Sequence, residues 1–109
     1  MHELSVAVEI LEIVAEGSNG GRVKKVTVEI GKLAAVLPAA LLFSFSLAAE
    51  GTPAEGAELE IVEKDGTARC RACASDVALA SIYGHCSCGS AELDWLTGTE
   101  LRVLSMEVL

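Results

Sequence analysis

The sequence predicts a small α/β (α+β) fold, in which a sheet of about three strands with two helices carries an inserted cysteine-bearing module. Segments of helical and of alternating apolar periodicity follow one another along most of the 109-residue chain. The four cysteines are confined to residues 70–88, near its end. An apolar segment follows them, which indicates that the chain returns to the first sheet after the cysteine region.

Composition and charge exclude several classes of protein. Apolar residues make up 51% of the chain, which is enough to bury a core, whereas aromatic residues make up only 4%. The core is therefore expected to consist mostly of Val, Leu, Ile and Ala. The formal net charge of −8 disfavours nucleic acid as a partner, because an acidic surface repels phosphate.

No basic segment precedes an apolar stretch at the N-terminus, so no secretory signal peptide is expected. Residues 33–49 contain no charge, but they reach only the short limit for spanning a bilayer and Pro38 interrupts them. A cytoplasmic protein outside the membrane is expected. Cysteines stay reduced in the cytoplasm, and clustered ones usually hold a metal ion there.

Two segments of the first half of the chain are predicted to be helical. The first covers about residues 4–16 and ends at Gly17. The second begins at Pro38, whose missing N–H suits a first helical turn, and ends at Gly51. The first helix is expected to bury the side chains that recur at helical spacing, namely Leu4, Val8, Leu11 and Ala15.

Alternating apolar residues predict strands at residues 23–31 and 57–61. Residues 100–109 carry apolar side chains on both faces, which predicts a third strand covered by its neighbours. The predicted division is an α/β domain of residues 1–66 and 99–109, with an inserted module of residues 67–98.

The cysteines form two closely spaced pairs, Cys70 with Cys73 and Cys86 with Cys88. Two such knuckles facing each other can surround a tetrahedral zinc ion with four thiolates, and a pair of disulfides is the less favoured alternative. One residue rather than two separates the second pair, and His85 stands beside it. Four cysteine ligands are favoured, with His85 as a possible substitute for one of them.

A zinc ion with four protein ligands has no open position for water or substrate. The histidines and general-base motif of zinc proteases are missing from the sequence, as is the His-x-Glu signature of nucleotide deaminases. The zinc is therefore expected to be structural, and the protein is expected not to be an enzyme. Its metal-binding energy would stabilise a zinc-ribbon-like module that has little core of its own.

Several stretches occur together here: MHE at the N-terminus, VEIGKL, LPAALLFSFSLAAEGTPAEGAELEI, the paired cysteines, and GTELRVLSMEVL at the end. In these stretches the chain resembles the hydrogenase-maturation nickel metallochaperone family (HypA/HybF), over essentially its whole length. The most specific part of this resemblance is the stretch LPAALLFSFSLAAEGTPAEGAELEI combined with the cysteine module. The second cysteine pair departs from the family, in which it is normally Cys-x-x-Cys.

The resemblance implies a small nickel-binding α/β domain with a zinc-binding insertion. It implies delivery of nickel to the large subunit of nickel-iron hydrogenase, in partnership with a nickel-handling maturation GTPase, and some relatives also serve urease. Nucleic acid and membrane partners are not expected, and the chain is expected to be a monomer or weak homodimer. Carried onto this sequence, the nickel site is Met1, His2 and Glu3, and the zinc site is Cys70, Cys73, Cys86 and Cys88.

The chemistry of the first three residues is consistent with nickel binding. The amine of Met1, the amide of His2 and its imidazole offer three nitrogens in fused chelate rings, and Ni(II) accepts square-planar nitrogen ligation. The Glu3 amide can provide a fourth nitrogen, and its carboxylate a weaker contact. In isolation, this tripeptide is more typical of a frayed terminus with an incidental histidine, and the resemblance reverses that interpretation.

An alternative function is a zinc-ribbon interaction module that transfers no nickel, and a second is a small zinc enzyme. The closed ligand shell disfavours the enzyme. A metal count separates the others, because only the metallochaperone requires a labile nickel ion in addition to zinc.

Overall fold

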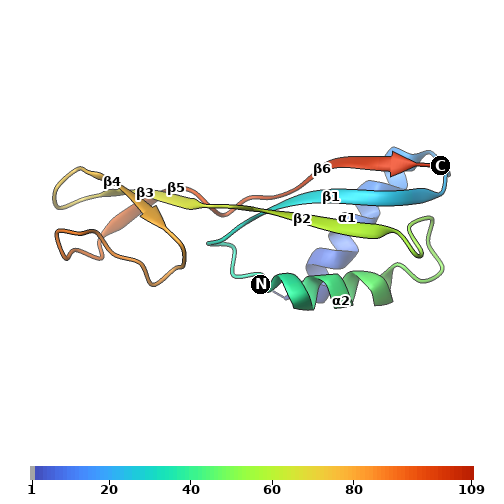
Figure 1. Ribbon diagram of the computed structural model, residues 1–109, viewed down its shortest axis with the longest axis horizontal. Coiled ribbons are helices and arrows are strands. Elements are labelled where there is room, and N and C mark those ends of the chain that lie inside the picture. The colour runs from blue at the N-terminus through green and yellow to red at the C-terminus, as the bar shows by residue number, and fades with distance from the viewer. Residues whose placement is uncertain (1) are drawn as a thin grey trace. The chain divides into compact units, whose positions relative to one another are not determined.

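The computed structural model describes residues 2–109. These residues form two helices and six strands (Figure 1). In chain order the elements are α1 (Glu3–Ser18), β1 (Val23–Gly31), α2 (Pro38–Ala48), β2 (Glu58–Lys64), β3 (Gly66–Cys70), β4 (Asp76–Leu79), β5 (Leu93–Thr97) and β6 (Leu101–Val108). Within the described residues, neither helix has the length and apolar character needed to cross a membrane. The predicted mixed α/β fold class is confirmed.

The chain divides into two compact units. The helical unit consists of the residues up to Glu29 together with Val36–Val62 and Arg102–Leu109. The cysteine unit consists of Ile30–Ala35 and Glu63–Leu101. The predicted division at residues 66 and 99 differs from these units at its edges, and it stays a prediction about independently folding domains.

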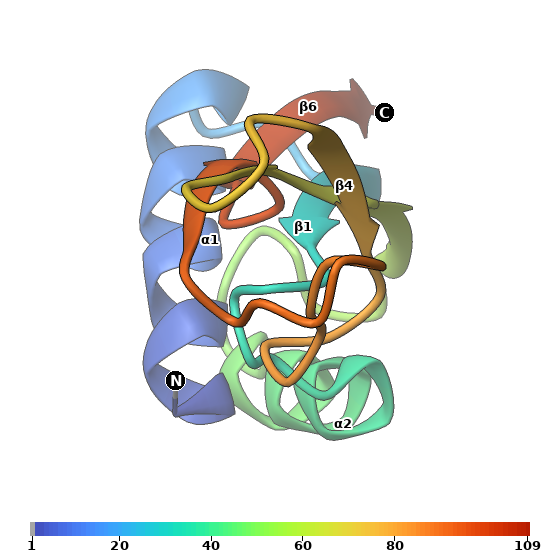
Figure 2. The same ribbon diagram turned by 90° about the vertical axis from the view of Figure 1, so that its left-hand side faces the viewer.

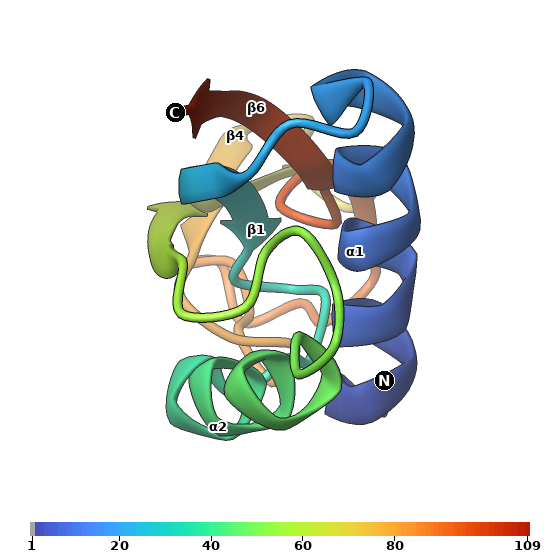
Figure 3. The same cartoon turned by 90° about the vertical axis from the view of Figure 1, so that its right-hand side faces the viewer.

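The helical unit is built on a three-stranded sheet with the order β2-β1-β6. The Leu109 amide donates to the Arg22 carbonyl at 2.8 Å, and the Gly31 amide donates to the Glu100 carbonyl at 2.8 Å, so β6 runs antiparallel to β1. This arrangement confirms that the last strand returns to the first sheet. Both helices lie on one side of the sheet (Figure 3). Their shared core includes Val6, Val14, Val26, Val28, Leu41 and Phe45.

The end of α1 differs from the prediction, because the helix continues through Gly17 to Ser18. A Cβ atom on Gly17 would come within 2.6 Å of the Met106 methyl carbon, so glycine makes room here for a side chain of β6. Asn19 then closes the helix in the left-handed conformation with φ 51°. Gly17 therefore serves packing rather than termination.

The buried face of α1 was also predicted wrongly. The helix buries Val6, Ala7, Ile10, Leu11 and Val14, so Leu11 is the only correctly predicted member of the stripe. Leu4 and Val8 remain 45% and 43% exposed. Two neighbouring stripes of α1 are apolar, and periodicity alone does not decide which of them meets the sheet.

The second helix begins at Pro38, as predicted, with Leu37 as its N-cap in extended conformation. It ends at Ala48 and buries only Leu41 and Phe45. The expectation that the last strand is covered on both faces is wrong. Strand β6 lies at the edge of its sheet, and Leu104 and Val108 are exposed.

The cysteine unit contains a second three-stranded sheet with the order β4-β3-β5. Both β4 and β5 run antiparallel to β3, and the register with β5 shifts between Thr67 and Ala68. The hairpin between β3 and β4 lies at one end of this sheet. The long loop after β4 begins at the opposite end and returns to the hairpin end, where β5 starts beside the end of β3 (Figure 2). The core of the unit is small: Leu33, Ala68 and Leu79 are buried, with Val77 and Leu93 packed against them.

Three segments of the cysteine unit cross at glycines. The Leu33 amide donates to the Gly98 carbonyl at 2.7 Å, and Gly98 has φ +113°, which only glycine adopts readily. A Cβ atom on Gly31 would overlap the backbone carbonyl of Gly98, and one on Gly98 would come within 2.6 Å of the Gly66 Cα. The segments around Gly31, Gly66 and Gly98 can cross this closely only because glycine has no side chain there.

We expect Gly31→Ala to lower the free energy of unfolding by more than about 2 kcal/mol, because backbone rather than a flexible side chain occupies the space of the new methyl group. Gly17→Ala is the matched control. Like Gly31, Gly17 has no positive φ, but its added Cβ would meet only the flexible end of the Met106 side chain, which can move aside. Chemical denaturation of both metal-loaded variants measures the difference, and equal losses of stability would show that the close crossing is not constraining.

Candidate metal centre

The first cysteine pair lies in the turn that connects β3 to β4. The Cys70 amide donates to the Ser75 carbonyl at 2.9 Å, and the Cys70 carbonyl accepts from the Ala74 amide at 2.9 Å. Ala74 has φ 60°, in the left-handed region, which turns the chain back toward β4. The turn therefore brings Cys73 close to Cys70 and closes on itself through backbone bonds.

The second pair forms a related turn in the loop between β4 and β5. The Cys86 amide donates to the Ser90 carbonyl at 2.9 Å, and the Cys86 carbonyl accepts from the Gly89 amide at 2.8 Å. Gly89 has φ +94°. The two turns follow the same pattern. The amide of the first cysteine donates to the carbonyl of a serine that lies two residues after the second cysteine. The residue between the second cysteine and this serine has a positive φ. The second pair therefore keeps the same backbone turn as the first pair. It differs only in having one residue fewer between its two cysteines.

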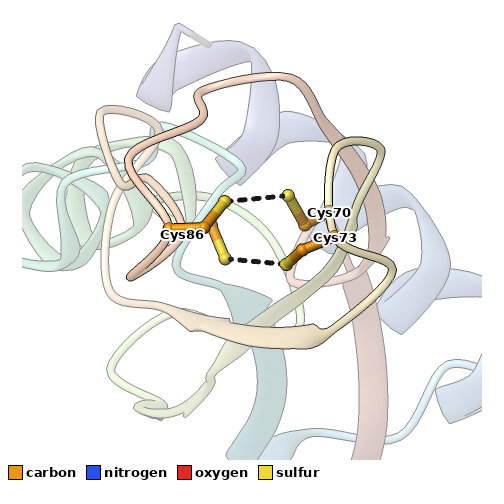
Figure 4. Close-up of side chains that lie close together, drawn as sticks. Cys70, Cys73 and Cys86 are labelled. Carbon is orange, nitrogen blue, oxygen red and sulfur yellow. Dashed lines mark hydrogen bonds between the residues drawn. The ribbon is translucent and has the colours of Figure 1, made fainter.

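The two turns bring all four thiols together (Figure 4). The Sγ atoms of Cys70 and Cys88 are 3.7 Å apart, those of Cys73 and Cys86 are 3.6 Å apart, and all four lie within 4.8 Å of one another. A zinc–sulfur distance of about 2.3 Å gives a tetrahedron with edges of about 3.8 Å. Disulfide sulfurs would be about 2.05 Å apart, and all four cysteines are free. The arrangement is therefore that of a four-cysteine metal site.

Backbone amides in each turn are directed at the sulfurs. The amide of Cys73, and secondarily that of Ala72, donates to the Cys70 sulfur and lowers the pKa of Cys70. The hydroxyl and then the amide of Ser75 lower the pKa of Cys73 to about 6. Hydrogen bonds of this kind stabilise thiolates, which are the form that binds metal.

The fourth thiol is affected differently. The Ser90 amide acts to lower the pKa of Cys88, but the neighbouring thiols of Cys86 and Cys70 outweigh it and raise this pKa to about 11. In the metal-free cluster, the Cys88 thiol therefore keeps its proton at neutral pH. An incoming metal ion must displace it, so metal binding to this cluster releases protons.

Burial differs within each pair in the same way. Cys70 and Cys86, the first members, are buried, whereas Cys73 and Cys88 are exposed. One side of the cluster is thus enclosed by the protein, and the other side faces solvent. His85 is exposed and is not part of this cluster, although it precedes Cys86 directly.

The predicted nickel ligands begin the helical unit. Met1 lies outside the described residues. His2 is exposed and is the N-cap of α1, with an extended backbone at φ −78° and ψ 119°. Its carbonyl accepts the Val6 amide at 3.2 Å. Glu3 is the first helical residue, and its carboxylate accepts the Leu37 amide at 3.2 Å.

The Glu3–Leu37 hydrogen bond joins the beginnings of α1 and α2, and no sequence pattern indicated it. The amides of Glu3 itself and of Leu37 lower the pKa of the Glu3 carboxyl. Glu3 therefore carries its negative charge at the N-terminal ends of both helices, where the helix dipoles favour it.

The fold and the site define a small α+β protein with an inserted four-cysteine metal module. The family model for "Hydrogenase/urease nickel incorporation, metallochaperone, hypA" matches residues 1–108. The chain belongs to this HypA family of nickel metallochaperones.

Individual relatives match over almost their whole length. The hydrogenase maturation factor HypA of Trichormus variabilis is 46% identical over 108 residues, covering 99% of this chain and 96% of the relative. That of Albidiferax ferrireducens is 40% identical over 112 residues, covering 99% of each chain. The solution structure of the Ni metallochaperone HypA from Helicobacter pylori is similar with a TM-score of 0.66 at 28% identity, covering 100% of this chain and 98% of that one.

We expect Gly89→Ala to weaken metal binding, because an L-residue with a side chain costs about 1–2 kcal/mol in the left-handed region. This corresponds to an affinity about 5- to 30-fold lower. No atom lies within 4 Å of the Cβ position, so the effect is conformational rather than a clash. Competition with a chromogenic chelator measures it, with Ala74→Gly as the control that relieves the same conformation in the first pair. Unchanged affinity in Gly89→Ala would show that the second knuckle does not depend on this turn.

Proposed function

We propose that this protein is a nickel metallochaperone that binds Ni(II) at its N-terminus, delivers it during maturation of nickel-iron hydrogenase, and holds a structural zinc ion at its four cysteines. The observation that carries the proposal is the family match, which begins at residue 1 and includes both the N-terminal tripeptide and the cysteine module. The protein is not an enzyme. It works in the cytoplasm as a monomer or weak homodimer.

The donor set of the cysteine site supports zinc. Four thiolates with tetrahedral spacing suit zinc, and they leave no coordination position for water or substrate. The bound ion stabilises a unit whose apolar cluster is small, with Leu33, Ala68 and Leu79 as its buried members. Its role is therefore to hold two loops together rather than to activate a substrate.

The position of His2 supports nitrogen ligation of nickel. The first amides of an α-helix have no partner within the helix, so the His2 amide can lose its proton to a metal without breaking a helical bond. The exposed imidazole of His2 is free to turn toward the same ion. A site at a chain end opens easily, which suits a cargo that must be released.

The Glu3 carboxylate is already a hydrogen-bond acceptor for Leu37. Its contribution is therefore to anchor the tripeptide at the start of α2, while the nitrogens of Met1 and His2 provide the principal ligands. The proposed partners are the nickel-handling maturation GTPase and the large subunit of the hydrogenase. Because the family description also names urease, apo-urease is the second client to test.

The proposed zinc shell predicts a specific X-ray absorption spectrum. We expect only sulfur neighbours at the zinc edge, about 2.3 Å from the metal. The spectrum and the zinc content of His85→Ala should be the same as those of the native protein, because His85 lies outside the thiol cluster. A nitrogen neighbour that disappears in His85→Ala would show instead that this histidine replaces a cysteine.

The proposed nickel chelate predicts that a single residue added before Met1 is nearly as harmful as His2→Ala. The extension keeps the imidazole and Glu3 but converts the amine into an amide, a far poorer ligand. Both changes should weaken nickel binding at least about tenfold, or about 1.4 kcal/mol. Binding to the native end should fade on acidification, because the amine, amide and imidazole must all lose protons.

Nickel titration of zinc-loaded, untagged protein measures these affinities, and zinc content and helicity provide the controls for folding. His2→Ala should leave both unchanged, because residue 2 precedes the first helix. Tight nickel binding by the extended protein would exclude the amine as a ligand. A native protein that binds zinc but no nickel would support the alternative of a zinc-ribbon interaction module.

A further inference from the structure

The four thiols differ in their access to solvent, and each exposed thiol has a buried partner. Cys73 and Cys88 are exposed, whereas Cys70 and Cys86 are buried. The Sγ atom of Cys73 lies 3.6 Å from that of Cys86, and the Sγ atom of Cys88 lies 3.7 Å from that of Cys70 (Figure 4). Both contacts join an exposed thiol of one knuckle to a buried thiol of the other.

The short spacing of the second knuckle limits how the thiols can pair covalently. A single residue separates Cys86 from Cys88, so a disulfide between them would close a very short and stiff ring. The turn that carries them is already closed by backbone hydrogen bonds. Cys86 and Cys88 must therefore each find a partner in the first knuckle. Of the two arrangements that meet this condition, the sulfur contacts favour Cys70 with Cys88 and Cys73 with Cys86.

The surroundings of the exposed thiols admit a small oxidant. The neighbours of Cys73 and Cys88 in the chain are small residues, namely Ala72, Ala74, Ser87 and Gly89. A thiol that coordinates a metal ion is deprotonated, and the thiolate is the form that reacts with oxidants. An accessible thiolate beside a second thiol is the arrangement found in redox-sensing cysteines.

We infer that Cys73 and Cys88 are the sites at which a hydroperoxide modifies this protein. Oxidation there releases the bound metal ion and joins the two knuckles through Cys70–Cys88 and Cys73–Cys86 disulfides. That the released ion is zinc rests on the proposed function, whereas the pairing of the thiols does not.

The reaction of one pair consumes one molecule of hydrogen peroxide. The Cys73 thiolate attacks a peroxide oxygen, the O–O bond breaks, hydroxide leaves and Cys73 becomes a sulfenic acid. The Cys86 thiolate then attacks the Cys73 sulfur, the S–S bond forms, the S–O bond breaks and a second hydroxide leaves. The two sulfurs together lose the two electrons that the peroxide gains. Cys88 and Cys70 react in the same way, and the ion leaves because thiolates are its ligands.

The proposed pairing makes the modification reversible. Each disulfide contains one sulfur from an exposed residue, Cys73 or Cys88, which a dithiol can attack. The buried partner then leaves as a thiolate, and the second thiol of the dithiol completes the exchange. The disulfides also join the same two loops that the ion joins. The oxidised protein should therefore resist denaturant better than the reduced, metal-free protein, because the cross-links restrict its unfolded chain.

The test treats the full-length, metal-loaded protein with hydrogen peroxide. A chromogenic chelator follows the released metal, and the remaining thiols are counted and then blocked. Disulfides are mapped by tandem mass spectrometry after cleavage at Arg71 and Tyr83, which separates Cys70, Cys73 and the second pair. Fragmentation inside the second knuckle distinguishes its two cysteines. The control is the same protein, stripped of metal and oxidised in urea, in which the folded geometry no longer selects the partners.

Metal release should rise in proportion to the loss of thiols. The Cys70–Cys88 and Cys73–Cys86 disulfides should be at least about tenfold more abundant than the other pairings, equivalent to about 1.4 kcal/mol of preference. The control should give a mixture, and a dithiol should restore both the thiols and metal binding in the native protein. Disulfides inside a knuckle, a pairing equal to that of the control, or thiols that do not react with peroxide would overturn the inference.

Two serine variants identify the thiol that meets the oxidant. In Cys73→Ser, the Cys70–Cys88 disulfide should form and the buried Cys86 should remain a thiol. In Cys86→Ser, the exposed Cys73 has no partner and should be oxidised further to the sulfinic acid. The reverse result, with further oxidation at Cys86 but not at Cys73, would contradict the inference. Retained metal before oxidation shows that a variant keeps its knuckles folded, and for a variant that loses the metal the mapping of the native protein decides.

The metal content of the protein before oxidation separates this inference from the proposed function. An isolated protein that holds another ion, or none, would refute the proposed structural zinc, and its disulfides would still be mapped in the same way. A zinc-loaded protein that forms disulfides inside its knuckles would refute the inference and leave the proposed function intact.

Discussion

The constraint on which the cysteine unit depends is that four thiols from two separate loops must converge on one point. The apolar core beside these loops is small: Leu33, which follows β1, packs with Ala68 of β3 and Leu79 of β4. A core of this size does not offset the conformational entropy of ordering such a segment. Under the proposed function, metal coordination supplies the missing free energy, so the ligands that define the site also stabilise the fold.

The convergence of the thiols is achieved by repeating one turn. In each knuckle the first cysteine is buried, its amide bonds to a serine carbonyl, and a residue with positive φ reverses the chain. The second knuckle has one residue fewer, and glycine occupies its left-handed position, where no steric penalty applies. The first knuckle has Ala74 there instead. The tetrahedral spacing of the sulfurs is thus compatible with unequal spacing in the sequence.

Periodicity was sufficient to predict the elements of the helical unit, because a single sheet with one covered face imposes a clear pattern on them. It failed for the buried face of α1, where Val6 and Val14 compete with the equally apolar Leu4 and Val8. It also gave no indication of β3, β4 and β5. These strands are short, and of the three only β3 is mostly buried. The loops they carry are constrained by the cysteines rather than by an apolar pattern.

The candidate sites differ in how far the sequence predicts them. Cysteine spacing alone predicted the metal cluster, since few other arrangements use two such pairs in a reduced environment. The N-terminal site depended on resemblance, because three residues carry little pattern. The bond from Leu37 to Glu3 joins residues far apart in the chain, and only the tertiary packing of the two helices creates it.

The two proposed metal sites avoid competing with each other because their donors differ. Thiolates retain zinc in a closed tetrahedral shell, and once that shell is filled it offers nickel no ligand. The N-terminal nitrogens instead favour the planar geometry that Ni(II) accepts, at a position where exchange is easy. A retained ion requires ligands from several parts of a fold, whereas a transferred ion requires ligands that can leave together. Adjacent atoms at the end of a chain meet the second requirement, because they separate from the ion without disturbing the folded core.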